Sequence, residues 1–362
     1  MDTGEAIPSA APLGLHRVGD PAKRGRSDEH AGCSRCDGVT HWVTPPGSNA
    51  RGAFPASPSS TDSSSSSPGQ PVDRMKKIIL GENAQVLPTL PANFARLIYI
   101  DPPFNTGKTQ RRTRIQVTAA EGSGARSGFG GRRYDVESIE SGSYEDAFDD
   151  FESFLMFRIR AALRCLTADG SLFVHLDSRE VHYIKVALDK LLGRDRFINE
   201  IIWAYDYGGR PRRRWPNKHD TILWYALNPD DYVFNFDEMD RIPYMAPGLV
   251  SKEKAERGKT PTDVWWHTIV PTSGREKTGY PTQKPLGVLN RVIKVHSCAG
   301  DVVLDFFGGS GTSGEAAALH HRGFVLIDRN PDAVAIAARR LARFQPECVG
   351  FDAAPSAQAA LF

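Results

Sequence analysis

The residues Asp101-Pro102-Pro103-Phe104, here called the acidic turn, directly follow the apolar run Leu97–Ile100. The run reads as a buried strand, and ligands of open α/β sheets bind at the carboxyl ends of strands. A carboxylate and a proline carbonyl can each accept a hydrogen bond, and a phenylalanine ring offers a face for stacking. The acidic turn therefore suits a flat ring with an exocyclic amine, although a strand followed by a stiff loop would look the same.

A second apolar run, Val302–Asp305, leads into the glycine-rich residues Phe306–Gly311, here called the glycine turn. Glycines allow the backbone to approach a ligand closely, and the helix expected next presents unpaired NH groups. The following strand, Gly323–Asp328, ends in an acid 19 residues beyond Gly309. An acid at about that distance suits the ribose hydroxyls of a nucleotide-like cofactor. A dinucleotide-binding oxidoreductase would share this pattern, but it would not explain the acidic turn.

The two turns together resemble the motifs of the amino-methyltransferases of DNA. In that family a proline pair, preceded by Asp, Asn or Ser and followed by an aromatic residue, is catalytic. A Phe-x-Gly-x-Gly motif binds the cofactor, and Phe307, Gly309 and Gly311 fit it. The catalytic motif comes first in this chain, as in the β group of these enzymes. Further segments that are similar to family elements are Gly81–Asn83, Gly170–Asp177, Asn199–Trp203 and Tyr280–Leu286.

The resemblance implies an α/β, Rossmann-like, S-adenosylmethionine-dependent methyltransferase fold. It should have a mostly parallel seven-stranded sheet, helices on both faces and a permuted motif order. The implied activity is methyl transfer from S-adenosylmethionine to the exocyclic amine of a base flipped out of double-stranded DNA. Because the motif begins with Asp, the resemblance favours adenine N6, and Phe104 in place of the commoner tyrosine keeps cytosine N4 as the alternative. An oxidoreductase and a DNA-binding protein without activity stay as alternatives from other classes.

The resemblance also implies roles for individual residues. The amine would donate hydrogen bonds to the Asp101 carboxylate and the Pro102 carbonyl, so that its lone pair points at the methyl, while Phe104 stacks on the base. Lys284 would meet the cofactor carboxylate, and Asp328 would hold the ribose or else cap a helix. The expected catalytic residues are Asp101, Pro102, Pro103 and Phe104. The expected cofactor-binding residues are Asp305, Phe307, Gly309, Gly311, Thr312, Asp328, Lys284 and Asn83.

Strand and helix signals alternate from Met75 onward, which predicts a wound α/β sheet beneath the two turns. Apolar residues at helical spacing predict helices over 145–166, Glu180–Leu192, Leu286–His296 and Asp332–Phe344. The methyltransferase domain is expected over 75–345. Residues 1–74, rich in Ala, Pro, Gly and Ser, are expected to be disordered, so that Met75 is a candidate true start. Residues 346–362 are expected to form a flexible tail.

Two basic stretches predict contact with DNA. The formal net charge of the chain is only +2, so the prediction depends on local clusters of positive charge rather than on the overall charge. Residues 108–143 read as a mobile Arg/Gly-rich loop, and residues 205–277 read as an inserted target-recognition region. Solvated surface arginines are the alternative. Trp265 and Trp266 are expected to pack in the core. The expected DNA-binding residues are Arg111, Arg112, Arg210, Arg212, Arg213, Arg214 and Lys218.

The cysteines exclude one reaction and support one location. Methylation of cytosine at carbon 5 needs a thiolate that follows a proline, and Cys165, Cys298 and Cys348 do not follow one. Five cysteines predict no disulfide framework, and without a signal sequence or membrane span the cytoplasm is expected. Cys33 and Cys36 make one Cys-x-x-Cys, which is weak evidence for zinc, so no metal is expected. Whether a restriction endonuclease or a second copy in a homodimer accompanies the chain stays open.

Overall fold

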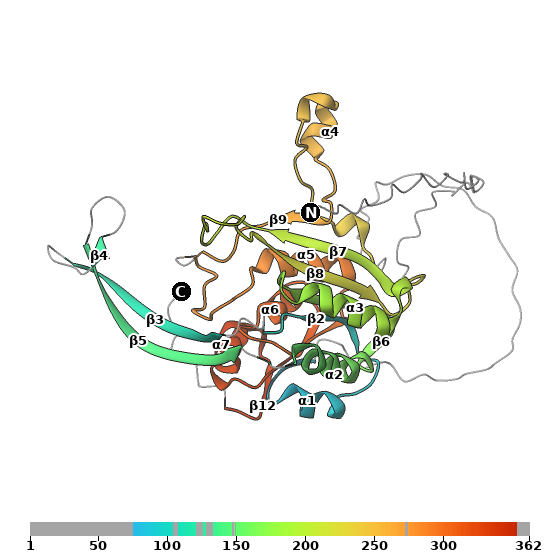
Figure 1. Ribbon diagram of the computed structural model, residues 1–362. Helices are drawn as coiled ribbons and strands as arrows, with labels where there is room; N and C mark the ends of the chain where they lie inside the picture. Colours follow the sequence, from blue (N-terminus) through green and yellow to red (C-terminus); the bar gives the residue numbers. More distant parts are fainter. Residues whose placement is uncertain are drawn as a thin grey trace, which may run out of the picture. The chain divides into compact units, whose positions relative to one another are not determined.

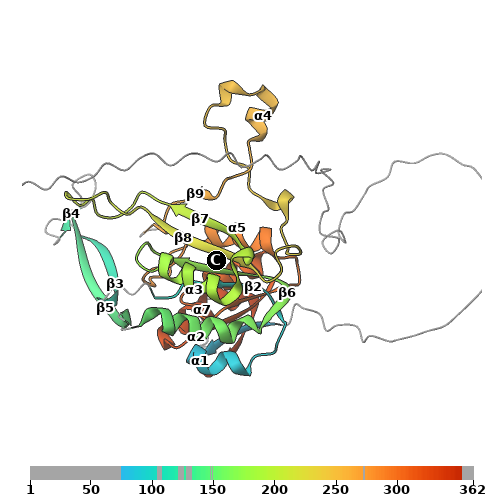
Figure 2. The same ribbon diagram turned by 45° about the vertical axis from the view of Figure 1, so that its right-hand side comes forward.

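The structure, a computed structural model, describes residues 75–103, 108–120, 126–127, 133–146, 148, 150–271 and 274–352. The predicted disordered segment 1–74 lies outside this range. The framework of the described part is one sheet flanked by helices (Figures 1 and 2), whose nine strands have the order β12-β1-β11-β10-β2-β6-β8-β7-β9. In that order its strands are Glu347–Val349, Lys76–Leu80, Gly323–Asp328, Val302–Asp305, Ala95–Ile100, Leu166–Leu176, His219–Ala226, Phe197–Ala204 and Val264–Trp266.

The sheet is mostly parallel, as expected. Neighbouring strands from β12 to β6 all run parallel, β8 is antiparallel to both β6 and β7, and β9 is parallel to β7. The sheet has nine strands rather than the predicted seven, because the three-residue strands β12 and β9 extend it at its two edges. Such short strands carry too few residues to show a period in the sequence.

Helices cover both faces of the sheet, because its central strands are apolar on both faces. α2 (Phe151–Leu163) and α3 (Val181–Leu192) share a buried cluster with Ile98 and Ile100 of β2. The remaining helices of the sheet are α5 (Leu286–His296), α6 (Thr312–Leu319) and α7 (Pro331–Leu341), which share a cluster with Leu97 and Tyr99 on the opposite face. Shorter elements are α1 (Asn83–Val86), α4 (Lys252–Arg257) and 3₁₀ turns at Leu87–Thr89, Arg194–Arg196, Phe236–Glu238, Pro247–Leu249 and Ala342–Phe344. None of the helices in the described ranges combines the length and apolarity that crossing a membrane requires.

The predicted helices exist, with local differences at their ends. The bounds predicted for α5 agree with the structure, and α3 begins one residue later than predicted. α2 begins only at Phe151, because Asp150 caps it by accepting a hydrogen bond from Ser153 N at 2.9 Å. α7 begins at Pro331 and gives way to a 3₁₀ turn at Ala342.

Three of the predicted segment descriptions change. Residues 108–143 contain a long antiparallel pair, β3 (Lys108–Ala120) and β5 (Arg133–Asp146), with the short β4 (Arg126–Ser127) beside β5. The region 205–277 is not simply inserted, because it contributes β8 and β9 to the main sheet. The tail 346–362 begins with β12, which pairs with β1 through Lys77↔Glu347, Ile78↔Cys348 and Ile79↔Val349.

Candidate active site

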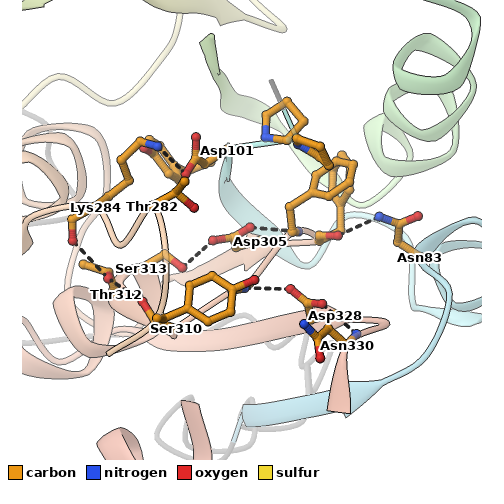
Figure 3. A pocket seen from close by; sticks show the side chains of 18 of the residues that line it. Asn83, Asp101, Thr282, Lys284, Asp305, Ser310, Thr312, Ser313, Asp328 and Asn330 are labelled. Carbon is orange, nitrogen blue, oxygen red and sulfur yellow. Dashed lines mark hydrogen bonds and ion pairs between the residues drawn. The ribbon is translucent and has the colours of Figure 1, made fainter. Parts of the chain in front are cut away.

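A cavity lies where β10 and β2 end side by side at the carboxyl edge of the sheet (Figure 3). The two strands pair in parallel, with Leu304 opposite Ile98, so that the residues ending each strand reach the same edge. Asp101 and Asp305 both line the cavity, and Asp328 joins them from the end of β11. The fold thus brings together the acidic turn and the glycine turn, which lie some two hundred positions apart in the sequence.

Asp101 has one carboxylate oxygen in an ion pair and the other without a hydrogen-bond partner. Lys284 Nζ lies 2.6 Å from Asp101 Oδ2, and the two side chains are 9% and 19% exposed. Asp101 Oδ1 is buried and, within the described residues, accepts no hydrogen bond. Lys284 was assigned to the cofactor carboxylate from the sequence, but its ammonium lies on Asp101 (Figure 3). Asp101 therefore lines the cavity with one acceptor oxygen that has no partner among the described residues.

Lys284 also connects the acidic turn to the glycine turn. Its carbonyl accepts a hydrogen bond from Thr312 Oγ1 at 3.2 Å, at the start of α6. The preceding Thr282 has φ 57°, a left-handed conformation that costs a β-branched residue energy. The neighbouring Gln283 holds this segment in place, because its Oε1 accepts from Thr278 N at 2.9 Å and its Nε2 donates to Glu276 O at 2.8 Å. Backbone strain is therefore located beside the cavity.

The glycine turn requires its glycines. Gly309 and Gly311 have φ 49° and φ 77°, and a Cβ on Gly311 would lie only 3.0 Å from Ala337 Cβ of α7. Asp328 holds the turn, since its Oδ2 accepts from Gly309 N and its Oδ1 from Asn330 N, both at 2.8 Å. The alternative role of Asp328 as the cap of α7 falls to Asn330, whose side chain accepts from the N of Asp332 at 2.9 Å.

Asp305 is a buried acid with an unusual protonation state. Burial raises its pKa to about 7, against the hydrogen bonds from Ser313 Oγ (2.5 Å) and Phe307 N (3.0 Å), which lower it. The negative charges of Asp101 and Asp328 add to the rise. Burial also raises the pKa of Asp328. A cationic ligand beside such buried acids would favour their ionised forms.

Asn83 lies at the cavity, but protein groups already engage its amide. Its Nδ2 donates to Phe306 O at 2.8 Å, and its Oδ1 accepts from Arg158 Nε at 2.6 Å. Arg158 Nη2 in turn donates to Glu82 Oε1 at 2.5 Å. Asn83 thus braces the glycine turn from α1. The sequence gives no signal for Arg158, which looks like an ordinary polar residue on α2.

Some predicted residues fall outside the described part of the chain. Phe104 is one of them, as are Cys33 and Cys36. Arg111 and Arg112 lie on β3, opposite Ser143 and Gly142 of β5, but only their backbone is described. Within the described residues, no group of three or more His, Cys, Asp or Glu side chains could hold a metal ion.

The predicted basic cluster lies on the connection between β7 and β8, residues 205–218, here called the arginine loop. Tyr205 N donates to Lys218 O at 2.9 Å and closes its base. β8 is antiparallel to β6, with Thr221 opposite Leu176, the last residue of β6. The arginine loop, which leads into β8, therefore lies beside the carboxyl end of β6, at the same edge of the sheet as Asp101.

Side chains of the arginine loop differ in their surroundings. Arg210 pairs with Asp206 at 3.1 Å, and Lys218 Nζ donates to Tyr207 O at 2.6 Å, so Lys218 stabilises the loop. Trp215 is 90% exposed, which leaves its ring available for stacking. The side chains of Arg210, Arg212, Arg213 and Arg214 are all exposed.

The two adjacent tryptophans of β9 differ from each other. Trp265 is buried, its Nε1 donates to Thr262 O at 2.9 Å, and Arg291 lies over its ring. Trp266 is 74% exposed. The prediction of core packing is therefore right for Trp265 and wrong for Trp266, because neighbouring residues of a strand point to opposite faces.

Comparison with known proteins agrees with this geometry. Residues 95–339 match the model of the N6/N4 DNA methylase family. The chain is 28% identical over 280 residues to the type II methyltransferase M.HpaI of Haemophilus parainfluenzae, covering 76% of each chain. It is 27% identical over 275 residues to the DNA adenine methyltransferase YhdJ of Escherichia coli, covering 74% of this chain and 82% of that one.

Among solved structures, the cytosine-N4-specific PvuII DNA methyltransferase has the same fold. Its TM-score is 0.51 at 14% identity, covering 75% of this chain and 89% of that one. The match to the family model spans more than half of the chain and includes Asp101, Lys284, Asp305 and Asp328. The chain therefore belongs to the N6/N4 DNA methylase family.

Proposed function

We propose that the protein transfers a methyl group from S-adenosylmethionine to the exocyclic amine of a base in double-stranded DNA, with adenine N6 as the target. The observation that carries this proposal is the buried, unpartnered Oδ1 of Asp101 in the same cavity as the glycine turn. The name of YhdJ, a DNA adenine methyltransferase, supports adenine. The cytosine-N4 specificity of the PvuII enzyme keeps cytosine as the second candidate, because the same fold serves that base.

The residues of the acidic turn would activate a weak nucleophile. The lone pair of an exocyclic amine is delocalised into the base, so the nitrogen must first become more tetrahedral. Its two N–H groups would donate to Asp101 Oδ1 and to the carbonyl of Pro102, which requires no proton transfer before attack. The Lys284 ion pair keeps the carboxylate fixed while the amine approaches. Phe104 would stack on the base after it leaves the duplex.

The residues of the cavity also fit the cofactor. S-adenosylmethionine supplies an activated methyl group on a sulfonium. Asp305 would bind its ammonium, Asp328 would bind the ribose hydroxyls, and Phe307, Gly309, Gly311 and Thr312 would surround the methionine portion. Asp305 fits the ammonium, because burial raises its pKa to about 7 and a cation beside it would favour its ionised form. Lys284 and Asn83 then act on protein groups rather than on the cofactor.

Binding of S-adenosylmethionine should strengthen as the pH rises from 6 to 7.5. With a pKa of about 7, the Asp305 carboxyl is mostly neutral at pH 6 and mostly ionised at pH 7.5. Only the ionised form pairs with an ammonium, so the affinity should rise about eightfold across this range. Isothermal titration at several pH values measures the effect. The Asp305→Asn variant should bind S-adenosylmethionine weakly, and its affinity should not change with pH. If the affinity of this variant rose with pH as steeply as that of the wild type, Asp305 would not be the group that binds the ammonium.

The arginine loop is the proposed DNA contact of the described residues. Its exposed arginines can meet phosphates and its exposed Trp215 can stack on a base, at the edge of the sheet where Asp101 lies. On β3, Arg111 and Arg112 are proposed to contribute further phosphate contacts. The type II name of M.HpaI supports a cognate restriction endonuclease as a partner of this chain.

The proposal is tested by the modified bases that the protein makes. The full chain is expressed in a bacterial host without DNA methylation, and the digested DNA is analysed for N6-methyladenine and N4-methylcytosine by mass spectrometry. We expect N6-methyladenine in one sequence context, and none with Asp101→Ala. Only N4-methylcytosine would reject the choice of base. Neither base, from a folded and expressed protein, would reject the function.

A further inference from the structure

Three buried side chains and the half-buried Tyr205 form a line of hydrogen bonds beside the cavity, and the proposed mechanism does not use them. Tyr205 Oη donates to Asp220 Oδ1 at 3.1 Å. His175 Nε2 lies 3.2 Å from Asp220 Oδ2, and Tyr99 Oη lies 2.7 Å from His175 Nδ1. Tyr99, His175 and Asp220 are 2%, 0% and 6% exposed. We call these four residues the buried chain.

The hydrogen bonds of the buried chain have a defined direction. Burial acts to raise the pKa of Asp220, but the hydrogen bond and charge of His175 and the charge of Lys284 lower it overall, so Asp220 is a carboxylate that only accepts. His175 Nε2 therefore donates to Asp220 Oδ2, and His175 Nδ1 lies at hydrogen-bonding distance from the Tyr99 hydroxyl, 2.7 Å away. Burial, with the charges of Asp101, Asp305 and Asp220, raises the pKa of Tyr99, which stays a phenol able to donate. The Tyr205 hydroxyl thus donates to Asp220, and the Tyr99 hydroxyl shares a hydrogen bond with His175.

The two ends of the buried chain lie at β2, which leads into Asp101, and at the base of the arginine loop. Tyr99 lies on β2 and lines the cavity, and Asp101, which also lines it, directly follows the end of this strand. Tyr205 begins the arginine loop and closes its base through Lys218. Between them, His175 on β6 and Asp220 on β8 cross two further strands of the sheet. The buried chain therefore joins the catalytic strand to the base of the arginine loop.

Lys284 gives the buried chain a second link to the reaction. Its charge acts on Asp220 as well as on Asp101, with which it pairs at 2.6 Å. Displacement of Asp220 would therefore alter the electrostatic field at the Lys284 ammonium, which pairs with the proposed catalytic residue Asp101. A buried polar network of this kind fixes one arrangement of its strands, because any slip leaves a buried group without a partner.

We propose that the buried chain is a positioning device, which holds Asp101 in register with the arginine loop so that a base delivered there meets a fixed acceptor. The inference rests on the proposed function. In this role the four residues of the buried chain act through Asp101 and through the arginine loop. A misplacement of about 1 Å at a reacting group can cost about a hundredfold in rate, so small shifts of β2 are sufficient.

The test removes one hydroxyl from each end of the buried chain and compares a matched control. Tyr99→Phe and Tyr205→Phe each delete one hydroxyl of the buried chain, the first fully buried and the second half-buried. Tyr225→Phe deletes a comparable one on the opposite face of the sheet, since Tyr225 is 1% exposed and donates to Asp189 at 2.8 Å. For each variant we measure single-turnover methyl transfer to DNA, the affinity for S-adenosylmethionine and the melting temperature.

The two end variants should lose rate in a way that stability does not explain. Tyr99→Phe and Tyr205→Phe should slow single-turnover transfer about 10- to 100-fold while cofactor affinity changes less than about twofold. Tyr225→Phe should lower the melting temperature comparably and keep its rate. The variant with both substitutions should be no slower than the slower single variant. Breaking the line of hydrogen bonds at either end already removes its effect, so a second break adds nothing.

Three outcomes would overturn the role. Rates of Tyr99→Phe and Tyr205→Phe equal to that of Tyr225→Phe would show a structural network only. A double variant slowed by the product of the single effects would show two independent sites. If Tyr99→Phe fails to fold, Tyr205→Phe at the far end decides by the same criteria. A folded wild-type protein without methyl transfer to DNA overturns the proposed function itself, whereas an active wild type with unaffected variants overturns only the inference.

Discussion

Asp101→Ala is expected to lose methyl transfer by about 100- to 1000-fold while it binds S-adenosylmethionine nearly as the wild type does. The variant removes the buried, unpartnered Oδ1, which is the proposed acceptor for the target amine. Loss of one preorganised hydrogen-bond partner of a reacting group typically lowers the rate by about this factor. The glycine turn is held separately by Asp328, so cofactor binding should persist. Single-turnover transfer and isothermal titration measure the two effects.

Asp101→Asn is the matched control for this prediction. The amide keeps one acceptor oxygen and the shape of the side chain, but it loses the charge that pairs with Lys284. We therefore expect a smaller loss of rate than in Asp101→Ala. Wild-type turnover in Asp101→Ala would remove Asp101 from the mechanism, and loss of cofactor binding in that variant would assign Asp101 to the cofactor instead.

Lys284→Met is expected to slow methyl transfer about a hundredfold with little change in cofactor affinity. Lys284 Nζ lies 2.6 Å from Asp101 Oδ2, and removing one partner of a largely buried ion pair leaves the other charge uncompensated. The Asp101 side chain should then move, and misplacement of a catalytic group by about 1 Å is costly. Lys284→Arg keeps the charge in a larger group, so it should recover part of the rate.

Lys185→Met provides the control for the loss of an ion pair. Lys185 Nζ lies 2.6 Å from Asp189 Oδ2 on the opposite face of the sheet, away from the cavity. This variant should keep its rate of transfer. A Lys284→Met variant that binds S-adenosylmethionine at least tenfold more weakly but reaches the wild-type rate at saturation would restore Lys284 to the cofactor carboxylate, the role that the family resemblance implied.

The sequence predicts well those elements that carry a strong local signal. The run Leu97–Ile100 lies within β2, and the apolar spacing of Leu286–His296 gives α5 with the same bounds. The positions of Asp101 and Asp305 at strand ends follow from such runs, because a strand that is buried on both faces reads as continuously apolar. Their meeting in one cavity followed from the family resemblance and from the rule that ligands bind at carboxyl ends of strands.

The sequence does not predict contacts that depend on tertiary distance. Lys284 and Asp101 are far apart in the chain, and nothing local distinguishes an ammonium that pairs with a carboxylate from one that meets a ligand. His175 and Asp220 look like single polar residues in strands until the pairing of β6 with β8 places them together. β8 itself was missed because its neighbours on both sides in the chain are polar loops, which made the whole region look inserted.

The pairing of the strands also determines when during synthesis the protein can become active. β1 is the first strand of the described chain, but its only neighbours among the described strands, β11 and β12, are the last two to be made. β2 likewise waits for β10 to complete its side of the sheet. Contacts this distant form late and slowly. A ribosome-bound chain that ends before Val302 therefore lacks the glycine turn and Asp328, so that the cavity beside Asp101 is incomplete until β10 and β11 have been made.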